Sequence, residues 1–229
     1  MRRMLVCLAT FMVVCVPTPV HAAAPGACAI VAPFTDSATF RYFPETRHAL
    51  GNGFKAYWDA HNVGTIFGYP IAGVPIFGSP ITEEFTEKSA SDGMMHTVQY
   101  FERARFEYHP EHPEPYKVEL ALLGDEATAG MRGRREFQPT EQLVSGFEKN
   151  PLYYFPETRH NIQLVPFAIQ WRNGGGLATF GYPISEQMSQ PDGATVQYFE
   201  RARFELHTDT GGKVFLGLLG DAVSPCRGS

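Results

Sequence analysis

The chain has 229 residues, 24 of them acidic and 19 basic, and carries a formal net charge of −5 at pH 7. A mildly acidic chain lacks the basic stripe with which proteins hold nucleic acids or anionic lipids. We therefore expect no nucleic acid among its partners.

The first 24 residues have the three parts of a secretory signal peptide. Arg2 and Arg3 give a positive start, residues 5–16 form an apolar run, and small residues occupy positions 22–24. We predict a signal peptide over residues 1–22, cleaved after Ala22 or, alternatively, after Ala24. The apolar run is shorter than the roughly 20 residues that span a bilayer, so no membrane span is expected. The mature protein is expected to be secreted or extracellular, or associated with the cell wall.

Removing the signal peptide leaves two cysteines, Cys28 near the start of the mature chain and Cys226 near its end. Two thiols in an oxidising compartment, without neighbouring Cys or His at metal-ligand spacing, indicate one disulfide. The alternative is two unpaired or intermolecular thiols.

The mature sequence contains a long internal repeat. Residues 42–48 (YFPETRH) recur as 154–160, residues 67–71 (FGYPI) as 180–184, residues 98–107 (VQYFERARFE) as 196–205, and residues 122–125 (LLGD) as 218–221. Such matches in one order predict two tandem copies of a module. The expected parts are an N-terminal segment (23–33), module 1 (34–125), a linker (126–146), module 2 (147–221) and a C-terminal tail (222–229). The oligomeric state is left open.

The first copy also holds a short duplication of its own. Residues 66–71 (IFGYPI) are followed by residues 76–81 (IFGSPI), and residues 82–84 then match residues 185–187. This indicates a surface insertion near Gly73 to Gly78. In the linker, we interpret Arg132, Arg134 and Arg135 as solvated charges, not as a binding patch.

Each copy contains one helical pattern. Apolar and aromatic residues recur at helical spacing in both copies and predict a short amphipathic helix: Phe54, Tyr57, Trp58 and His61 in the first, Phe167 and Trp171 in the second. Three glycines at residues 174–176 are typical of a helix stop. We interpret the aromatic stripe as core in preference to a ligand platform, because buried aromatics usually serve packing.

Strand patterns follow the helix. Residues 97–108 alternate and are rich in aromatics, which predicts a strand. Phe101 and Phe106 would lie on opposite faces of an unbroken strand, so a turn or bulge is expected near Arg103. Residues 117–124 and 213–220 predict a further strand. The expected fold is α+β, with two tandem copies that each contain a short helix and an antiparallel hairpin or three-stranded sheet. Copies of this size are marginal alone, so we expect them to pack on each other.

The strings FPETxH, FGYPI and VQYFERARFE resemble a tandem repeat of uncharacterised exported bacterial proteins. More distantly, residues 180–186 with residues 198–200 and 210–212 resemble the LGFP repeat, a cell-envelope module. Phe180 stands where that motif has Leu, and Arg-Ala stands where it has a Gly pair. The resemblance implies an extracellular or wall-associated accessory module and no catalytic residues.

Charged residues repeated in both copies are the candidate ligand site. They are Glu45, Arg47 and His48 with Glu102, Arg103 and Arg105, and their counterparts Glu157, Arg159 and His160 with Glu200, Arg201 and Arg203. Carboxylates and arginines suit hydrogen bonds to sugar hydroxyls or peptide carboxylates. The competing interpretation, which the repeat favours, is that ion pairs of these residues tie the Pro-Glu-Thr turn to the hairpin. If they bind, Arg103, Arg105, Arg201 and Arg203 are expected to face solvent on turns.

Two chemical alternatives are weaker. Residues 109–114 (HPEHPE) have ligand-type side chains, but only His207 remains in the second copy, so we predict a solvated loop and no metal or cofactor. Glu45 and Glu102 leave a carboxylate-based hydrolase as an alternative. Two equal copies suit bivalent binding better than one active site. We expect a non-catalytic binding module for cell-wall glycan or a surface protein, with a purely structural spacer as the main alternative.

Overall fold

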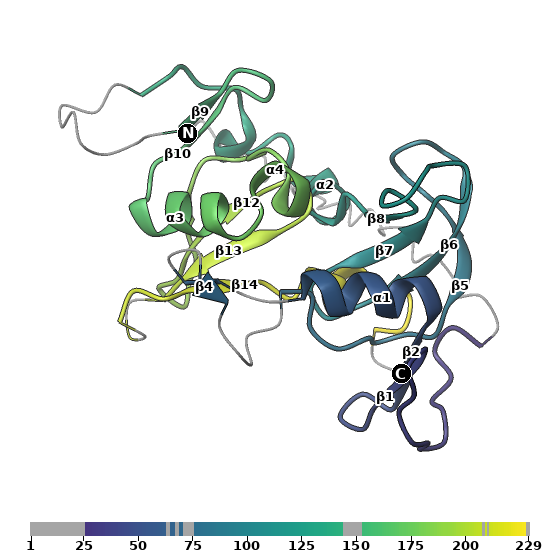
Figure 1. Ribbon diagram of the computed structural model, residues 1–229. Helices are drawn as coiled ribbons and strands as arrows, with labels where there is room; N and C mark the ends of the chain where they lie inside the picture. Colours follow the sequence, from purple (N-terminus) through teal and green to yellow (C-terminus); the bar gives the residue numbers. More distant parts are fainter. Residues whose placement is uncertain are drawn as a thin grey trace, which may run out of the picture.

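The computed structural model describes residues 26–62, 65–66, 69–70, 76–143, 153–207, 209 and 211–227. The predicted signal peptide, both predicted cleavage points and Gly73 of the predicted insertion lie outside these residues. The described chain combines helices with antiparallel sheets, which confirms the α+β class (Figure 1). Among its helices, we find none with the length and apolar character needed to cross a membrane.

The first half (residues 34–125) contains two hairpins, one long helix and a four-stranded sheet. In chain order its elements are β1 (Phe40–Phe43), β2 (His48–Gly51), α1 (Asn52–His61), β3 (Thr65–Ile66), β4 (Tyr69–Pro70), β5 (Phe85–Lys88), β6 (Met95–Tyr100), β7 (Arg105–Tyr108), β8 (Val118–Leu120) and the start of α2 (Leu123–Thr128). The sheets are β1-β2, β3-β4 and β5-β6-β7-β8, all antiparallel.

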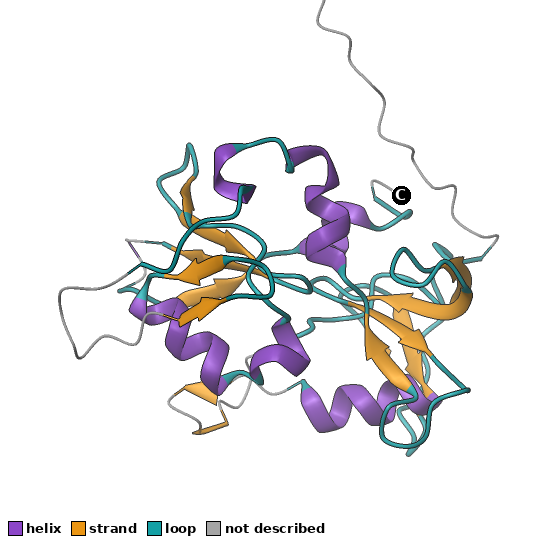
Figure 2. Cartoon of the chain, turned by 90° about the horizontal axis from the view of Figure 1, so that it is seen from above, coloured by secondary structure: helices purple, strands orange, loops and turns teal. Residues whose placement is uncertain are grey.

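The second half (residues 147–221) follows two short 3-10 turns, η1 (Ala129–Met131) and η2 (Arg135–Phe137). Its elements are β9 (Tyr153–Phe155), β10 (His160–Ile162), α3 (Val165–Asn173), α4 (Gly176–Phe180), β11 (Met188–Ser189), β12 (Thr195–Tyr198), β13 (Arg203–Leu206), β14 (Val214–Leu216) and α5 (Leu219–Val223). The sheets are β9-β10 and β11-β12-β13-β14. Figure 2 shows the two four-stranded sheets side by side, each with a long helix against one face.

The central hairpins of the two halves have the same register. Thr97 pairs with Tyr108 in β6-β7, and Thr195 pairs with Leu206 in β12-β13. Both hairpins close with a hydrogen bond of 2.8 Å, from the Phe101 amide to the Ala104 carbonyl and from the Phe199 amide to the Ala202 carbonyl. The parity break expected near Arg103 is therefore a tight turn.

Several expected details of the strands and helices are wrong. Each half has a four-stranded sheet where a hairpin or three strands were expected, because β5 and β11 are too short to show an alternating pattern. Residues 123–124 and 219–220 were expected in strands but begin the helices α2 and α5. The three glycines end α3 at Gly174, yet Gly176 starts α4 after Gly175 takes a φ of 109°, a conformation that favours glycine.

The first half contains two Gly-x-Pro runs, and the one that is structurally equivalent to the run in the second half is not the one with the more similar sequence. Residues 77–81 take the place of residues 180–184. The Trp58 indole donates to the Gly78 carbonyl at 2.9 Å, and the Trp171 indole donates to the Gly181 carbonyl at 2.9 Å. Gly78 and Gly181 have φ values of 78° and 75°. The degenerate run, in which Ser79 replaces tyrosine, is thus the structural one.

A buried glutamine attaches the first hairpin to the large sheet in each half. The Gln99 side-chain amide donates to the Ala49 carbonyl of β2 at 2.7 Å and to the Thr82 carbonyl at 2.8 Å. Gln197 makes the same two bonds, to Asn161 and Ser185, at the same distances. Because both amides are fully buried, these bonds fix where the Pro-Glu-Thr turns lie.

Two apolar clusters form the core, and each draws on both halves. The first lies between the long helices and the sheets and is built around Phe54, Phe106, Phe167 and Phe204. The second lies on the other face of the sheets, and the disulfide cysteines pack against it. The aromatic stripe of α1 is only partly core. Phe54 is buried, Tyr57 and Trp58 are half-buried, and His61 is exposed.

The halves contact each other through reciprocal backbone bonds. The Gly124 amide donates to the Glu200 carbonyl at 2.9 Å, and the Asp221 amide donates to the Glu102 carbonyl at 3.3 Å. The helices α2 and α5 pack against each other beside these bonds. A disulfide joins Cys28 to Cys226, as the sequence predicted.

We expect Gly124→Ala and Gly220→Ala each to lower the free energy of unfolding by about 1–3 kcal/mol, as overpacking does. A Cβ at these positions would lie 1.8 Å from the Phe199 carbonyl oxygen and 1.7 Å from the Phe101 carbonyl oxygen, so the halves must separate slightly. Urea denaturation measures the effect. Gly130→Ala is the control, because its Cβ meets no atom within 4 Å. Equal stability of all three variants would contradict the close approach.

Candidate functional site

A groove runs between α1 and the adjacent strands of the first sheet. Its volume is about 590 Å³, and its lining comes from α1, from β6, β7 and β8, from the residue before β5 and from the loop before β8. Figure 1 shows α1 lying across this sheet. The volume falls within the range of sites that hold small molecules or a few sugar units.

Two tyrosines are the main aromatic surfaces of the groove. Tyr57 stacks on His61 of the next helical turn, with ring centroids 4.2 Å apart, and packs edge-on against Phe106 at 5.1 Å. Tyr108, at the end of β7, has 36% of its surface exposed. Partial burial raises the pKa of Tyr57, so its hydroxyl stays protonated and can donate a hydrogen bond at neutral pH.

Polar groups of both signs surround these rings. Asn52 and Thr97 supply neutral hydrogen-bonding groups, Glu84 and Glu114 supply carboxylates, and Lys117 supplies an ammonium group. Such a mixture does not create the single-sign field that attracts a polyanion. It offers donors and acceptors to a ligand rich in hydroxyl groups.

The second half does not repeat the aromatic lining. Gln170 stands in α3 where Tyr57 stands in α1, and Leu206 ends β13 where Tyr108 ends β7. The two helices otherwise share the pair Phe54 and Trp58, which corresponds to Phe167 and Trp171. The groove is therefore a feature of the first half, which the repeated strings in the sequence could not indicate.

The structure divides the charged residues that the sequence grouped. Glu45 and Glu102 share one partner, Ser79. The Ser79 hydroxyl donates to Glu45 at 2.7 Å, and the Ser79 amide donates to Glu102 at 3.1 Å. In the second half, the Tyr182 amide donates to Glu200 at 2.9 Å. Burial and a hydrogen bond to Glu157 raise the pKa of the Tyr182 hydroxyl. These carboxylates attach the turn to the hairpin through residue 79 or 182, not through the expected ion pairs.

Within the turn itself, the charged side chains point in different directions. His48 and His160 are buried, whereas Glu45, Arg47, Glu157 and Arg159 are exposed. Arg47 and Arg159 have positive φ values of 59° and 57°. Their backbone amides close the turns by donating hydrogen bonds of 2.7 Å to the carbonyls of Phe43 and Phe155. The exposed four are the members of the predicted group that a ligand could reach at the turns.

The two buried histidines have carboxylate partners that were not predicted from the sequence. The His48 Nδ1 lies 3.0 Å from a Glu83 carboxylate oxygen, and the His160 Nδ1 lies 3.2 Å from Glu186. Burial raises the pKa of Glu186, but its hydrogen bonds, with that from His160 foremost, outweigh this and hold the pKa below its usual value. The match between residues 82–84 and residues 185–187 was the signal that could have identified these glutamates.

Arg105 was expected to face solvent, but it is buried. Only 3% of its side chain is exposed, and its guanidinium contacts three carboxylates and one hydroxyl: Glu107 at 2.6 Å, Glu126 at 2.8 Å, Glu87 at 3.3 Å and Tyr100 at 2.9 Å. Burial alone would lower the pKa of Arg105, but the neighbouring Tyr100, Glu126 and Glu107 raise it overall. Arg203 is less enclosed, with 29% of its side chain exposed, and pairs with Glu205.

Arg103 and Arg201 contact the opposite half. The Arg103 Nε donates to the Leu216 carbonyl at 3.1 Å, and the Arg201 Nε donates to the Leu120 carbonyl at 3.2 Å. Each is about a quarter exposed. Both arginines therefore hold the halves together.

Comparison with known proteins adds no family to this picture. The chain matches no protein-family model, and no curated protein matches its sequence.

Proposed function

We propose that the chain is a non-catalytic binding module of the extracellular space or cell envelope, built from two tandem copies of one fold, and that its groove binds a wall glycan. The single observation that carries the proposal is the open groove beside α1, with Tyr57 and Tyr108 in its wall. Aromatic faces cover the C–H faces of sugars, while nearby polar groups bind the hydroxyls that fix orientation.

Two further observations support this function over the alternatives. The charges of Glu84, Glu114 and Lys117 are mixed, which suits an uncharged or weakly charged ligand. Glu45 and Glu102 accept hydrogen bonds from Ser79, so the two carboxylates named for the hydrolase serve the turn. The equal register of the two central hairpins supports the tandem copies.

In this proposal the copies have different roles. The first copy supplies the groove. The second copy supplies the surface on which α2 and the turn between β6 and β7 pack. The groove takes the place of the paired ligand contacts expected around Arg103 and Arg105 and around Arg201 and Arg203, because Arg105 is buried and Arg103 and Arg201 contact the opposite half.

Retention of the purified protein on isolated bacterial cell wall tests the function. We expect retention that survives protease treatment of the wall, because the ligand is glycan. Loss of retention after that treatment would indicate a surface protein as the ligand. No retention on either material would favour the structural spacer, and release of soluble sugars or peptides would favour the hydrolase.

Tyr108→Ala and Tyr57→Ala are each expected to weaken retention about tenfold or more, as loss of an aromatic anchor at the centre of an interface does. The matched controls are Leu206→Ala and Gln170→Ala, which remove the corresponding side chains of the second half. Tyr57 also packs on the core, so thermal denaturation must show that its variant is folded at the assay temperature. If the control variants lose as much retention as the tyrosine variants, the groove is not the site.

A further inference from the structure

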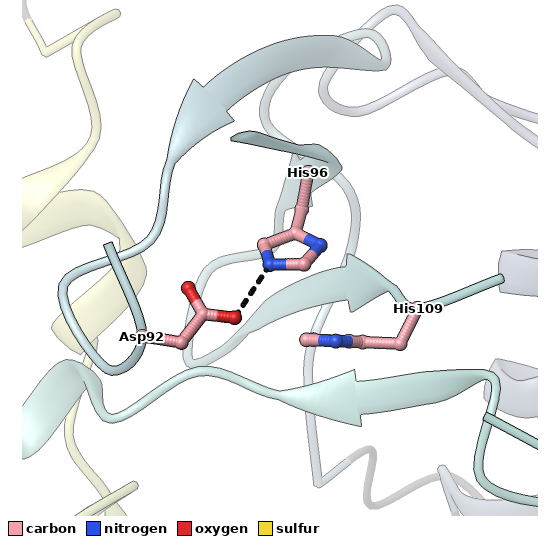
Figure 3. A group of neighbouring side chains, drawn as sticks. All are labelled: Asp92, His96 and His109. Carbon is pink, nitrogen blue, oxygen red and sulfur yellow. Dashed lines mark hydrogen bonds and ion pairs between the residues drawn. The ribbon is translucent and has the colours of Figure 1, made fainter. Parts of the chain in front are cut away.

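Three side chains with metal-ligand chemistry converge on the face of the first sheet that lies away from the groove. Asp92 lies in the turn between β5 and β6, His96 lies in β6, and His109 follows the last residue of β7 (Figure 3). Each offers one ligand atom, and these three atoms all lie within 4.8 Å of one another. Thr97 lines the groove, and neighbouring residues of a strand point to opposite faces, so His96 points away from it.

The outer contacts of this cluster already orient its members. The Met94 amide donates to one Asp92 oxygen at 2.8 Å, and the other oxygen lies 2.8 Å from the His96 Nε2. The His96 Nδ1 lies 3.3 Å from the Tyr108 carbonyl, and the His109 Nδ1 lies 2.9 Å from Glu111. Metal-binding histidines typically donate their second ring N–H to a carbonyl or carboxylate of this kind.

His96 lies at the centre of the cluster. Its Nε2 is 2.8 Å from an Asp92 oxygen, and the centroid of its ring lies 4.0 Å from that of the His109 ring. The three ligand atoms are thus close enough to share one ion.

An independent observation concerns the other ring nitrogen of His109. His109 is 5% exposed, and its Nε2 has no hydrogen-bond partner among the residues that the structure describes. The nearest carboxylate oxygen, that of Glu107, lies 3.6 Å away, beyond hydrogen-bond distance. A buried polar atom without a partner is costly, and coordination of a metal ion would satisfy it.

The second half shows that this part of the fold does not require His96. Ala194 precedes Thr195 in β12 as His96 precedes Thr97 in β6, and Ala194 is buried. The sheet thus forms with alanine at this position, although His207 corresponds to His109. The register that the two halves share therefore does not require a histidine at this position.

A second set of potential ligands, which combines His109 with His112 and Glu119, lies beside the first. The side chains of His112 and Glu119 are each 42% exposed and already form a pair at 2.7 Å. The Asp92 set is more buried and contains the histidine that the other half lacks. The sequence had indicated a solvated loop without metal at residues 109–114, where neither Asp92 nor His96 could be seen as a partner.

We propose that Asp92, His96 and His109 form a binding site for one divalent transition-metal ion of the Zn²⁺ type. Two imidazoles and one carboxylate suit such ions, and three protein ligands leave a fourth position for water. The ion would fasten the turn between β5 and β6 to the end of β7.

The test uses the full mature chain after removal of metals with a chelator. Titration with Co²⁺, followed by its visible absorption, and competition by Zn²⁺ should give one ion per chain. His96→Ala and His109→Ala should each weaken binding at least about 100-fold, more than loss of an outer contact costs. His207→Ala and His112→Ala should leave the affinity unchanged.

His96→Ala copies the alanine of the second half, so we expect it to fold, and circular dichroism of the metal-free variant checks this. The proposal is overturned if the parent chain binds no ion. It is also overturned if His96→Ala retains the parent affinity, or if His112→Ala loses as much as His109→Ala.

Discussion

Replacing Arg105 by alanine is expected to lower the free energy of unfolding by about 3–5 kcal/mol, the range observed when one partner of a buried ion pair is removed. The guanidinium is the shared cation of Glu87, Glu107 and Glu126, and its side chain is 3% exposed. Without it, three carboxylates remain close together around a buried space. Urea denaturation of the disulfide-bonded protein measures the loss.

Arg203→Ala is the matched control, because Arg203 occupies the same position of the second hairpin. Its side chain is 29% exposed, and Ala222 stands where Glu126 stands in the first half. We expect a loss of roughly 1 kcal/mol or less, as for partly solvated pairs. If both variants lost stability equally, the carboxylate cluster around Arg105 would not be its source.

Replacing both cysteines by serine is expected to lower the free energy of unfolding by about 5 kcal/mol in the chain-entropy model. The bond joins residues separated by 198 positions, so the unfolded chain gains much freedom when the bond is absent. The parent protein unfolded in the presence of a reductant should match the Cys28→Ser/Cys226→Ser variant. Mass spectrometry that finds two free thiols in the oxidised protein would contradict the bond itself.

Long-range order in the fold could be predicted where the sequence repeats long strings. The helix α1 and the hairpins β6-β7 and β12-β13 follow from patterns of several residues, and the disulfide follows from the two cysteines of the mature chain. The strands β5 and β11 could not be predicted, because they have four and two residues and pair only when a longer neighbour is present. The role of residues 77–81 was missed because residues 67–71 match the second half more closely in sequence, whereas contacts with Trp58 select the other run.

The candidate sites depend on contacts that no local pattern contains. Tyr57 was visible as part of an aromatic stripe, but the groove that it lines also needs Tyr108 and the loop before β8, which lie far along the chain. Asp92 and His96 belong to a cluster of possible metal ligands only because the β6-β7 pairing brings His109 beside them. The structure separates the charged residues that the sequence grouped, and one partner of the buried Arg105 is Glu126, which lies in a segment interpreted as linker.

The reciprocal bonds between the halves affect how the molecule unfolds. The first turn of a helix has amides without partners in the helix, and neither α2 nor α5 has a side-chain cap. The Glu200 carbonyl accepts from the start of α2, and the Glu102 carbonyl accepts from the start of α5. Each half therefore completes a helix of the other, so neither can open without exposing polar backbone groups in both. Thermal unfolding should accordingly be a single cooperative transition instead of two.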